Sequence, residues 1–249
     1  MSNQQTINKL YEMCLSTMAK TYREQLDNSA FGELSFEDRF SCIVEAEWLQ
    51  RKNNRVARLI KNATLKYSQA SMESVEYHDD RKLNKEELLK LSSCNYLREN
   101  RNIIIIGASG SGKSWLSCAL GLAACRSYYS VRYIRLPELL DELKIARAGD
   151  SFRKAITHYQ QIKLLILDEW LLTPLREQEA IDLLEIVEAR NQASSTIFCS
   201  QFKPGGWHEK IGQDTLADAI LDRIIHNSYQ ILIEGIMSMR ERKGIKHNP

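Results

Sequence analysis

The 249-residue chain is 43% hydrophobic and 27% charged and carries a formal net charge of +2. This composition excludes wholesale disorder. No apolar run approaches the roughly 18 residues of a membrane span, and the first residues lack the basic start and apolar stretch of a signal peptide. The six cysteines form no CxxC pair, so we expect reduced thiols in a cytoplasmic protein that does not contact a membrane.

The first hundred residues show no strand pattern and predict helices over residues 3–27, 35–67 and 84–99. From Asn102 onward, short β-rich runs alternate with helical stretches, which is typical of a parallel sheet with helices on both faces. The predicted strands are Ile103–Ile106, Val131–Leu136, Leu164–Leu167, Thr196–Cys199 and Tyr229–Ile233. We therefore predict an α/β domain over residues 96–249 and a helical region over residues 1–95.

The second predicted helix contains a group of basic residues with no acid among them. They are Arg51, Lys52, Arg55, Arg58, Lys61 and Lys66. At 100° per residue, the three arginines and Lys66 lie within about 80° of one another, and apolar residues lie roughly opposite. An ordinary solvated face is the alternative, but such faces usually alternate acids with bases. We expect this face to contact the phosphate backbone of double-stranded DNA without specifying its sequence.

The strongest motif is Gly107–Ser114, which follows an apolar strand and opens an apolar helix. Its glycines let backbone N–H groups point at phosphates, and the helix N-terminus adds partial positive charge. Lys113 would reach the β- and γ-phosphates, and Ser114 would offer its hydroxyl to Mg²⁺. The alternative is an accidental glycine turn, but such a turn would not require a strand before it and a helix after it. The residues predicted to bind the nucleotide are Gly107, Ala108, Ser109, Gly110, Ser111, Gly112, Lys113, Ser114 and Trp115.

Two adjacent acids, Asp168 and Glu169, end the apolar run Leu164–Leu167. We expect Asp168 to hold Mg²⁺ through water and Glu169 to act as the general base on the attacking water. A buried strand that ends in two solvated acids is the alternative. A strand intervenes between the phosphate loop and this pair, and a base stands beside the metal aspartate. Both features favour hydrolysis of a nucleoside triphosphate over phosphoryl transfer to a small molecule.

Two further polar positions are candidates for the same site. The strand ending at Ser200 and Gln201 would put a polar side chain beside the γ-phosphate if the sheet places it centrally; otherwise these residues only begin a turn. Arg223 lies late in the amphipathic helix 216–226 and could act as an arginine finger in a neighbouring subunit. Its alternative is a salt bridge to a nearby aspartate: Asp214, Asp218 or Asp222.

Four segments, taken together, resemble the motifs of the IstB-like ATPases, which are AAA+ proteins encoded beside an insertion-sequence transposase and close to the DnaC helicase loaders. The segments are Gly107–Ser114, Leu164–Trp170, Ser195–Gln201 and Ala219–His226. The resemblance implies that Lys113 and Ser114 are the Walker A pair and that Asp168 and Glu169 are the Walker B pair. It further implies that Gln201 or Ser200 is sensor 1 and that Arg223 is the arginine finger.

The resemblance also implies an AAA+ P-loop fold with a five-stranded parallel sheet, ATP and Mg²⁺ as cofactors, and ATP-dependent self-association on DNA. A cognate transposase would be recruited or stimulated. The chain departs from the family pattern at Ser114-Trp115, where Thr-His is commoner, and at Gly235–Arg240, which is one residue longer and leaves Arg240 open as sensor 2. The residues after Ile233 are too few for a full helical lid domain. A DnaC-like helicase loader and a nucleotide-gated DNA-binding switch remain alternatives.

Overall fold

The computed structural model describes residues 2–235 and 237–244, and the chain divides into two compact units, one ending at Arg58 and the other beginning at Leu59. The division lies inside helix α3 (Phe36–Ala63) and is earlier than the boundary predicted between residues 95 and 96. The reason is packing. Leu88 and Leu91 are buried in the same apolar cluster as strand residues of the sheet, so the stretch from Leu59 onward belongs to the sheet unit.

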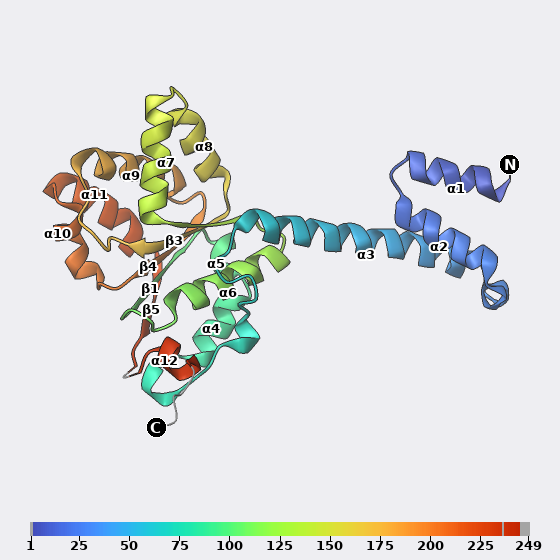
Figure 1. The fold of residues 1–249 in the computed structure, drawn as a ribbon, viewed down its shortest axis with the longest axis horizontal. Coiled ribbons are helices and arrows are strands. Elements are labelled where there is room, and N and C mark those ends of the chain that lie inside the picture. Colours follow the sequence, from blue (N-terminus) through green and yellow to red (C-terminus); the bar gives the residue numbers. More distant parts are fainter. Residues whose placement is uncertain (1, 236, 245–249) are drawn as a thin grey trace. The chain divides into compact units, whose positions relative to one another are not determined.

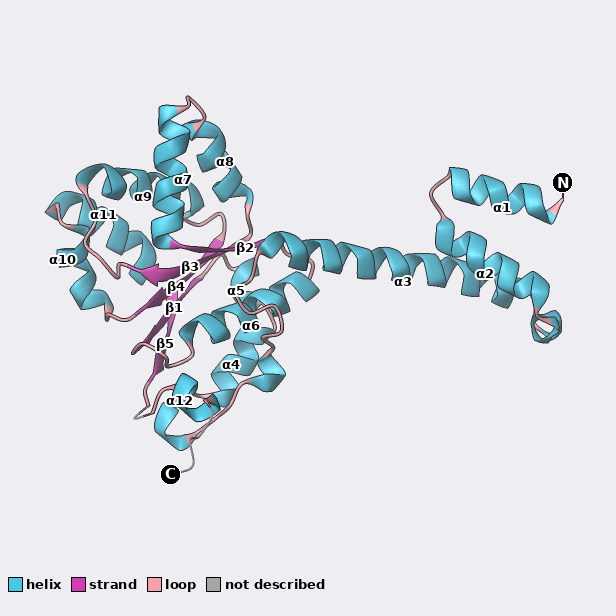
Figure 2. Ribbon diagram, in the orientation of Figure 1, coloured by secondary structure: helices cyan, strands magenta, loops and turns pink. Residues whose placement is uncertain are grey.

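The unit that ends at Arg58 is helical, as predicted (Figure 2). It contains α1 (Asn3–Glu12), α2 (Ser16–Asp27), the short 3₁₀ helix η1 (Ser29–Glu33) and most of α3. The single helix predicted over residues 3–27 is divided, because Cys14 adopts a left-handed φ of 58°. The carboxylate of Glu47 accepts the backbone N–H groups of Thr17 and Met18 at 3.0 and 3.2 Å. It therefore caps the free N–H groups in the first turn of α2.

The second unit is built on the predicted five-stranded parallel sheet (Figure 1). The strands are β1 (Asn102–Gly107), β2 (Val131–Arg135), β3 (Leu164–Trp170), β4 (Ser195–Ser200) and β5 (Ser228–Ile233). Their spatial order is β2-β3-β4-β1-β5, so β4 lies between the strand of the acid pair and the strand of the phosphate loop. All five predicted strands are confirmed.

Helices cover both faces of this sheet (Figure 1). One face packs against α4 (Lys85–Ser92), α5 (Asn95–Arg98) and α6 (Lys113–Arg126). The other packs against α7 (Leu136–Ala148), α8 (Phe152–Gln161), α9 (Glu177–Arg190), α10 (Trp207–Ile211) and α11 (Asp214–Ile225). In β1, Ile103 and Ile105 join the first cluster, and Ile104 and Ile106 join the second. Burial on both faces explains the uninterrupted apolar run.

Short helices complete the unit: η2 (Met72–Ser74), η3 (Asp79–Arg81), η4 (Pro204–Gly206) and α12 (Met239–Lys243). The helix predicted over residues 35–67 ends at Ala63, because Thr64 has a left-handed φ of 49°. The helix predicted over 84–99 is divided at Cys94, where φ is 62°. The backbone of Arg240 lies in α12, but its side chain is outside the described part of the structure, as are Ile236 and residues 245–249.

Candidate functional site

The phosphate loop leaves β1 at Gly107 and ends where α6 begins at Lys113. Gly112 has a φ of 96°, and a Cβ there would lie 2.9 Å from a guanidinium nitrogen of Arg81. Gly110 has a φ of 78°, and a Cβ there would lie 2.8 Å from the Cβ of Ser238. Both positions therefore need glycine for backbone conformation and for space.

Lys113 is buried at the end of this loop, where α6 begins. Its ammonium group donates to the carbonyl oxygens of Gly107 and Ala108 at 2.7 and 2.8 Å. The loop therefore holds the cation beside the N-terminus of α6, where the free backbone N–H groups also favour an anion. This arrangement is the one expected of a phosphate-binding loop.

The acid pair lies at the carboxyl end of β3, and Asp168 is almost fully buried. Asp168 Oδ2 accepts the hydroxyl groups of Ser114 at 2.6 Å and Tyr133 at 2.5 Å, and Oδ1 accepts the backbone N–H of Glu169 at 2.9 Å. The end of the phosphate loop and the acid pair are thus joined directly by the bond between Ser114 and Asp168.

Glu169 occupies an irregular part of β3. Its φ is 56°, and the pairing with β4 shifts register between Leu167 and Trp170. Left-handed backbone is unusual for a residue with a side chain and is concentrated at functional sites. The Glu169 carboxylate is half-buried and lies 3.8 Å from the guanidinium of Arg135.

One pocket brings these groups together. Its lining includes Lys66, Ser109, Gly110, Lys113, Ser114, Asp168, Glu169, Cys199 and Gln201. The two candidate polar residues at the end of β4 differ here. Gln201 is exposed and lines the pocket, whereas Ser200 is buried, donates to the carbonyl of Trp170 and accepts the indole N–H of Trp207. Of the two, it is Gln201 that lines this pocket.

A second pocket, of about 320 Å³, shares Gly110, Lys113 and Ser114 with the first. It is lined by Tyr67, Gln69, Ser74, Glu76, Arg81, Gly110, Gly112, Lys113, Ser114, Trp115 and Met239. The rings of Tyr67 and Trp115 lie 5.6 Å apart. Loop, aromatic rings and polar groups together offer space for the base and sugar of a nucleotide. Trp115 was predicted at this site, but Tyr67 and Gln69 were not, because they belong to the region assigned to the N-terminal helices.

Arg81, in η3, was also missed by sequence analysis. It is buried, and it donates to the carbonyl of Ser111 at 3.0 Å and to the carbonyl of Glu76. Burial lowers the pKa of its guanidinium group, although an arginine remains charged at neutral pH. Arg81 therefore supports the phosphate loop through the carbonyl of Ser111. No local motif marked it, since Asp79-Asp80-Arg81 is an unremarkable charged turn in the sequence.

Arg223 lies away from the phosphate loop of its own chain. It lines a separate pocket with Asn227, whose carbonyl accepts the N–H of Asn102 at the first residue of β1. The phosphate loop follows the opposite end of that strand. Arg223 forms an ion pair with Glu188 of α9 and donates to the carbonyl of Ala219 at 2.8 Å. The salt-bridge partners considered from sequence, Asp214, Asp218 and Asp222, were wrong, because α11 packs against α9 and Glu188 comes within reach.

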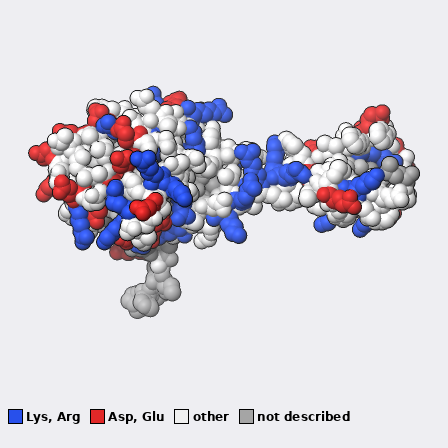
Figure 3. All heavy atoms as spheres, turned by 90° about the horizontal axis from the view of Figure 1, so that it is seen from above, with Lys and Arg blue, Asp and Glu red and all other residues white. Residues whose placement is uncertain are grey.

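The basic residues of α3 are not equally available. Arg51 pairs with Glu47 at 2.8 Å and also donates to the carbonyl of Cys14. The ammonium of Lys52 lies 3.3 Å above the ring of Trp48. Arg51, Arg55, Arg58 and Lys61 are all exposed, whereas Lys52 is half-buried, and Figure 3 shows basic side chains along α3.

Lys66 does not share this helical face, contrary to prediction, because α3 ends at Ala63. Its exposed side chain lines the pocket of Asp168 and Glu169 instead. All six cysteines are free thiols. Among the described helices, none combines the length and apolar character of a membrane crossing. The described residues also contain no group of three or more His, Cys, Asp or Glu side chains able to bind a metal by themselves.

Comparisons with known proteins agree with this geometry. Residues 8–247 match the family of IstB-like ATP binding proteins. The chain is 40% identical over 238 residues to an insertion sequence ATP-binding protein, y4pL, of Sinorhizobium fredii, covering 96% of this chain and 97% of the relative. It is 37% identical over 201 residues to the ATP-binding protein of insertion sequence IS1162 of Pseudomonas fluorescens, covering 81% and 87%.

Solved structures share the fold of the sheet unit. DnaI matches with a TM-score of 0.58 at 20% identity, covering 66% of this chain and 91% of that chain. The DnaC helicase loader matches with a TM-score of 0.57 at 16% identity, covering 68% and 98%. These likenesses are of fold, and they agree with the five-stranded parallel sheet flanked by helices. Because the family match spans nearly the whole chain and its curated relatives are alike over nearly their whole length, the chain belongs to the IstB-like ATP-binding proteins.

Proposed function

We propose that this chain is a cytoplasmic ATPase that assembles on double-stranded DNA when ATP is bound and helps a transposase in DNA transposition. One observation carries the proposal. A single pocket gathers a phosphate-binding lysine, a hydroxyl and a carboxylate suited to Mg²⁺, a candidate base and a candidate sensor. They are Lys113, Ser114, Asp168, Glu169 and Gln201.

The donor set fits Mg²⁺. The Ser114 hydroxyl and the Asp168 carboxylate lie 2.6 Å apart, and both are hard oxygen donors. Mg²⁺ usually keeps several waters and is bound by one or two such groups together with substrate phosphates, so Ser114 would hold the ion directly and Asp168 would hold it through water. When bound, the ion neutralises charge that develops on the β- and γ-phosphate oxygens. Lys113 and the loop N–H groups hold the phosphates in place.

Hydrolysis also needs an activated water. Glu169 carries the carboxylate that takes a proton from the attacking water, and its left-handed backbone turns it out of the regular strand. The amide of Gln201 lines the same pocket and orients that water or contacts the γ-phosphate.

Self-association supplies the remaining charge. Arg223 lines a pocket apart from its own phosphate loop, so it serves as a finger only for the site of a second copy. A positive group at the transferring phosphate stabilises the transition state and is typically worth 10³-fold or more in rate.

The DNA partner is inferred from α3 and the transposase from the relatives. The exposed side chains of Arg51, Arg55, Arg58 and Lys61 offer phosphate contacts. The curated relatives are described as insertion sequence ATP-binding proteins. A helicase loader is the second candidate, favoured by the fold shared with the DnaC helicase loader. Membership of the IstB-like family favours transposition.

A comparison of Glu169→Gln with Lys113→Ala tests the proposal. Glu169→Gln keeps the shape of the side chain but removes the base, so it should bind a fluorescent ATP analogue, hydrolyse ATP at least a hundredfold more slowly and remain assembled on DNA. Lys113→Ala should lose nucleotide binding and assembly together. The transposase readout is strand transfer with purified cognate transposase, measured with and without this protein.

Three outcomes would contradict parts of the proposal. Near wild-type hydrolysis by Glu169→Gln would show that Glu169 is not the general base. Wild-type protein that binds DNA only with ATP, yet turns over no faster than Glu169→Gln, would be a nucleotide-gated switch. Stimulation of a replicative helicase but not of the transposase would favour the loader.

A further inference from the structure

A buried tyrosine contacts the carboxylate expected to serve the metal. Tyr133 lies in β2, and its hydroxyl donates to Asp168 Oδ2 at 2.5 Å. The register explains the contact. Tyr133 pairs with Ile166, so Asp168 lies two residues further along β3 on the same face of the sheet. Diagonal neighbours of this kind are within reach of an aromatic side chain.

A phenylalanine would fill the space of the Tyr133 ring equally well, so packing alone does not require the hydroxyl. The ring is buried in the apolar cluster between the sheet and α6, and a polar group taken into such surroundings is unfavourable unless it is hydrogen-bonded. The hydroxyl meets that requirement by donating to Asp168 Oδ2.

The other two hydrogen-bond donors to Asp168 also have other roles. Ser114 is the hydroxyl expected to bind the metal, and the N–H of Glu169 belongs to the irregular turn at the end of β3. Tyr133 is held from elsewhere: its carbonyl accepts the hydroxyl of Thr64 at 3.0 Å, and its strand is paired with β3. Tyr133 is thus a hydrogen-bond donor that the fold holds in place, and Tyr133 is not itself a metal ligand.

We propose that Tyr133 is a positioning residue for Mg²⁺, because its hydroxyl fixes the Asp168 carboxylate in the orientation that receives the ion together with Ser114. This inference rests on the proposed function and deepens it. Removal of an outer-shell hydrogen bond at a metal site typically lowers metal affinity 10- to 100-fold, and Tyr133→Phe should fall within that range.

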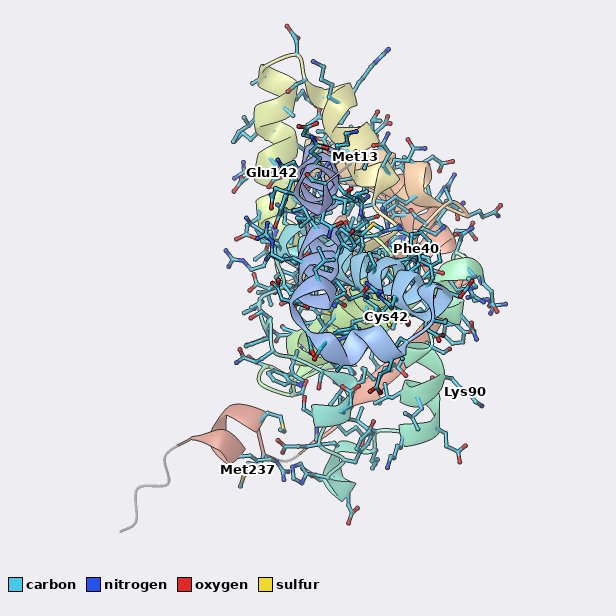
Figure 4. All side chains as sticks on the ribbon, turned by 90° about the vertical axis from the view of Figure 1, so that its right-hand side faces the viewer. Met13, Phe40, Cys42, Lys90, Glu142 and Met237 are labelled. Carbon is cyan, nitrogen blue, oxygen red and sulfur yellow. The ribbon has the colours of Figure 1, made fainter. Side chains whose placement is uncertain are left out.

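The test is Tyr133→Phe, with Tyr159→Phe as the matched control. Tyr159 is also buried, and its hydroxyl also donates to a carboxylate, that of Glu142 on α7, which is labelled in Figure 4. Each variant removes one hydroxyl and one such bond and keeps the ring. Only the first bond ends on a residue that lines the phosphate pocket.

Two binding readouts separate positioning from folding. Affinity for a fluorescent ATP analogue is measured in EDTA and across a Mg²⁺ titration, and Mn²⁺ bound with nucleotide is counted by electron paramagnetic resonance. In Tyr133→Phe the Mg²⁺ midpoint should rise 10- to 100-fold, the affinity in EDTA should stay within about twofold, and turnover should recover at saturating Mg²⁺. Tyr159→Phe should keep the wild-type midpoint.

An unchanged or lower Mg²⁺ midpoint in Tyr133→Phe, or an equal rise in Tyr159→Phe, would overturn the inference. Failure of the proposed function looks different: wild-type protein would then show no Mg²⁺-dependent nucleotide binding at all. A loss of affinity in EDTA as large as the loss in Mg²⁺ would mean that the hydroxyl supports the loop and not the metal carboxylate, which also overturns the inference.

Discussion

Replacement of Arg223 by alanine separates a role in the neighbouring subunit from a role in the fold. In this chain Arg223 pairs with Glu188, and the exposed fractions of the two side chains are 28% and 55%. An ion pair so open to solvent contributes about 0–1 kcal/mol to stability. A finger at a transferring phosphate contributes about 10³-fold in rate, which is about 4 kcal/mol at 1.36 kcal/mol per factor of ten. The two roles therefore predict effects of different size in different assays.

The matched control is Glu188→Ala, which removes the same ion pair and leaves the arginine. Both variants should lower the free energy of unfolding by about 1 kcal/mol or less, measured by urea denaturation. Both should bind ATP normally, because the phosphate loop is untouched. Only Arg223→Ala should lose hydrolysis, by about 10³-fold, in steady-state assays with DNA present.

A mixing experiment assigns the effect to a second copy. Arg223→Ala protein offers an intact phosphate loop, and Lys113→Ala protein offers an intact arginine, so an equal mixture should regain part of the activity. Full hydrolysis by Arg223→Ala alone would refute the finger. An equal loss of hydrolysis in Glu188→Ala would show that the ion pair, and not the free arginine, supports activity.

Two further sets of substitutions test the basic residues of α3 and the support that Arg81 gives to the phosphate loop. Replacing Arg55, Arg58 and Lys61 together by alanine should weaken DNA binding alike for all sequences and lower the log–log salt slope by about 0.9 for each DNA phosphate that is no longer neutralised, measured by fluorescence anisotropy; an unchanged slope would make this an ordinary solvated face. Arg81→Ala leaves the carbonyls of Ser111 and Glu76 without their donor and should cost about 2–3 kcal/mol of stability and weaken ATP binding. Arg126→Ala, at an exposed 3.9 Å pair, is the control, and equal thermal stability of the two variants would contradict this role of Arg81.

Parts of the site that are contiguous in sequence could be predicted, and parts assembled across the fold could not. The phosphate loop needs only a strand, glycines and a helix start, all of which stand side by side from Ile103 to Trp115. Tyr133 reaches Asp168 only because β2 pairs with β3 in one particular register. Arg81 reaches Ser111 across thirty positions of chain, and no periodicity encodes that contact.

Extrapolation along a helix failed where the helix ended. The prediction that Lys66 shares a face with the arginines of α3 holds only if 100° per residue continues past Ala63. Thr64 stops the helix with a left-handed backbone, and its hydroxyl donates to the carbonyl of Tyr133. A β-branched residue is seldom found in that conformation, so the local sequence did not predict that the helix ends there. A tertiary contact accompanies it, and Lys66 lines the phosphate pocket as a result.

The acid pair depends on a similar irregularity. In a regular strand, successive side chains point to opposite faces, so neighbouring acids could not both line one pocket. Asp168 keeps the face that β3 shares with Tyr133, whereas Glu169, with its φ of 56° and the register shift before Trp170, leaves the alternation. Both carboxylates then line the pocket with Lys113. The sequence predicts the two acids, but the distortion of the strand is what brings both carboxylates into one pocket.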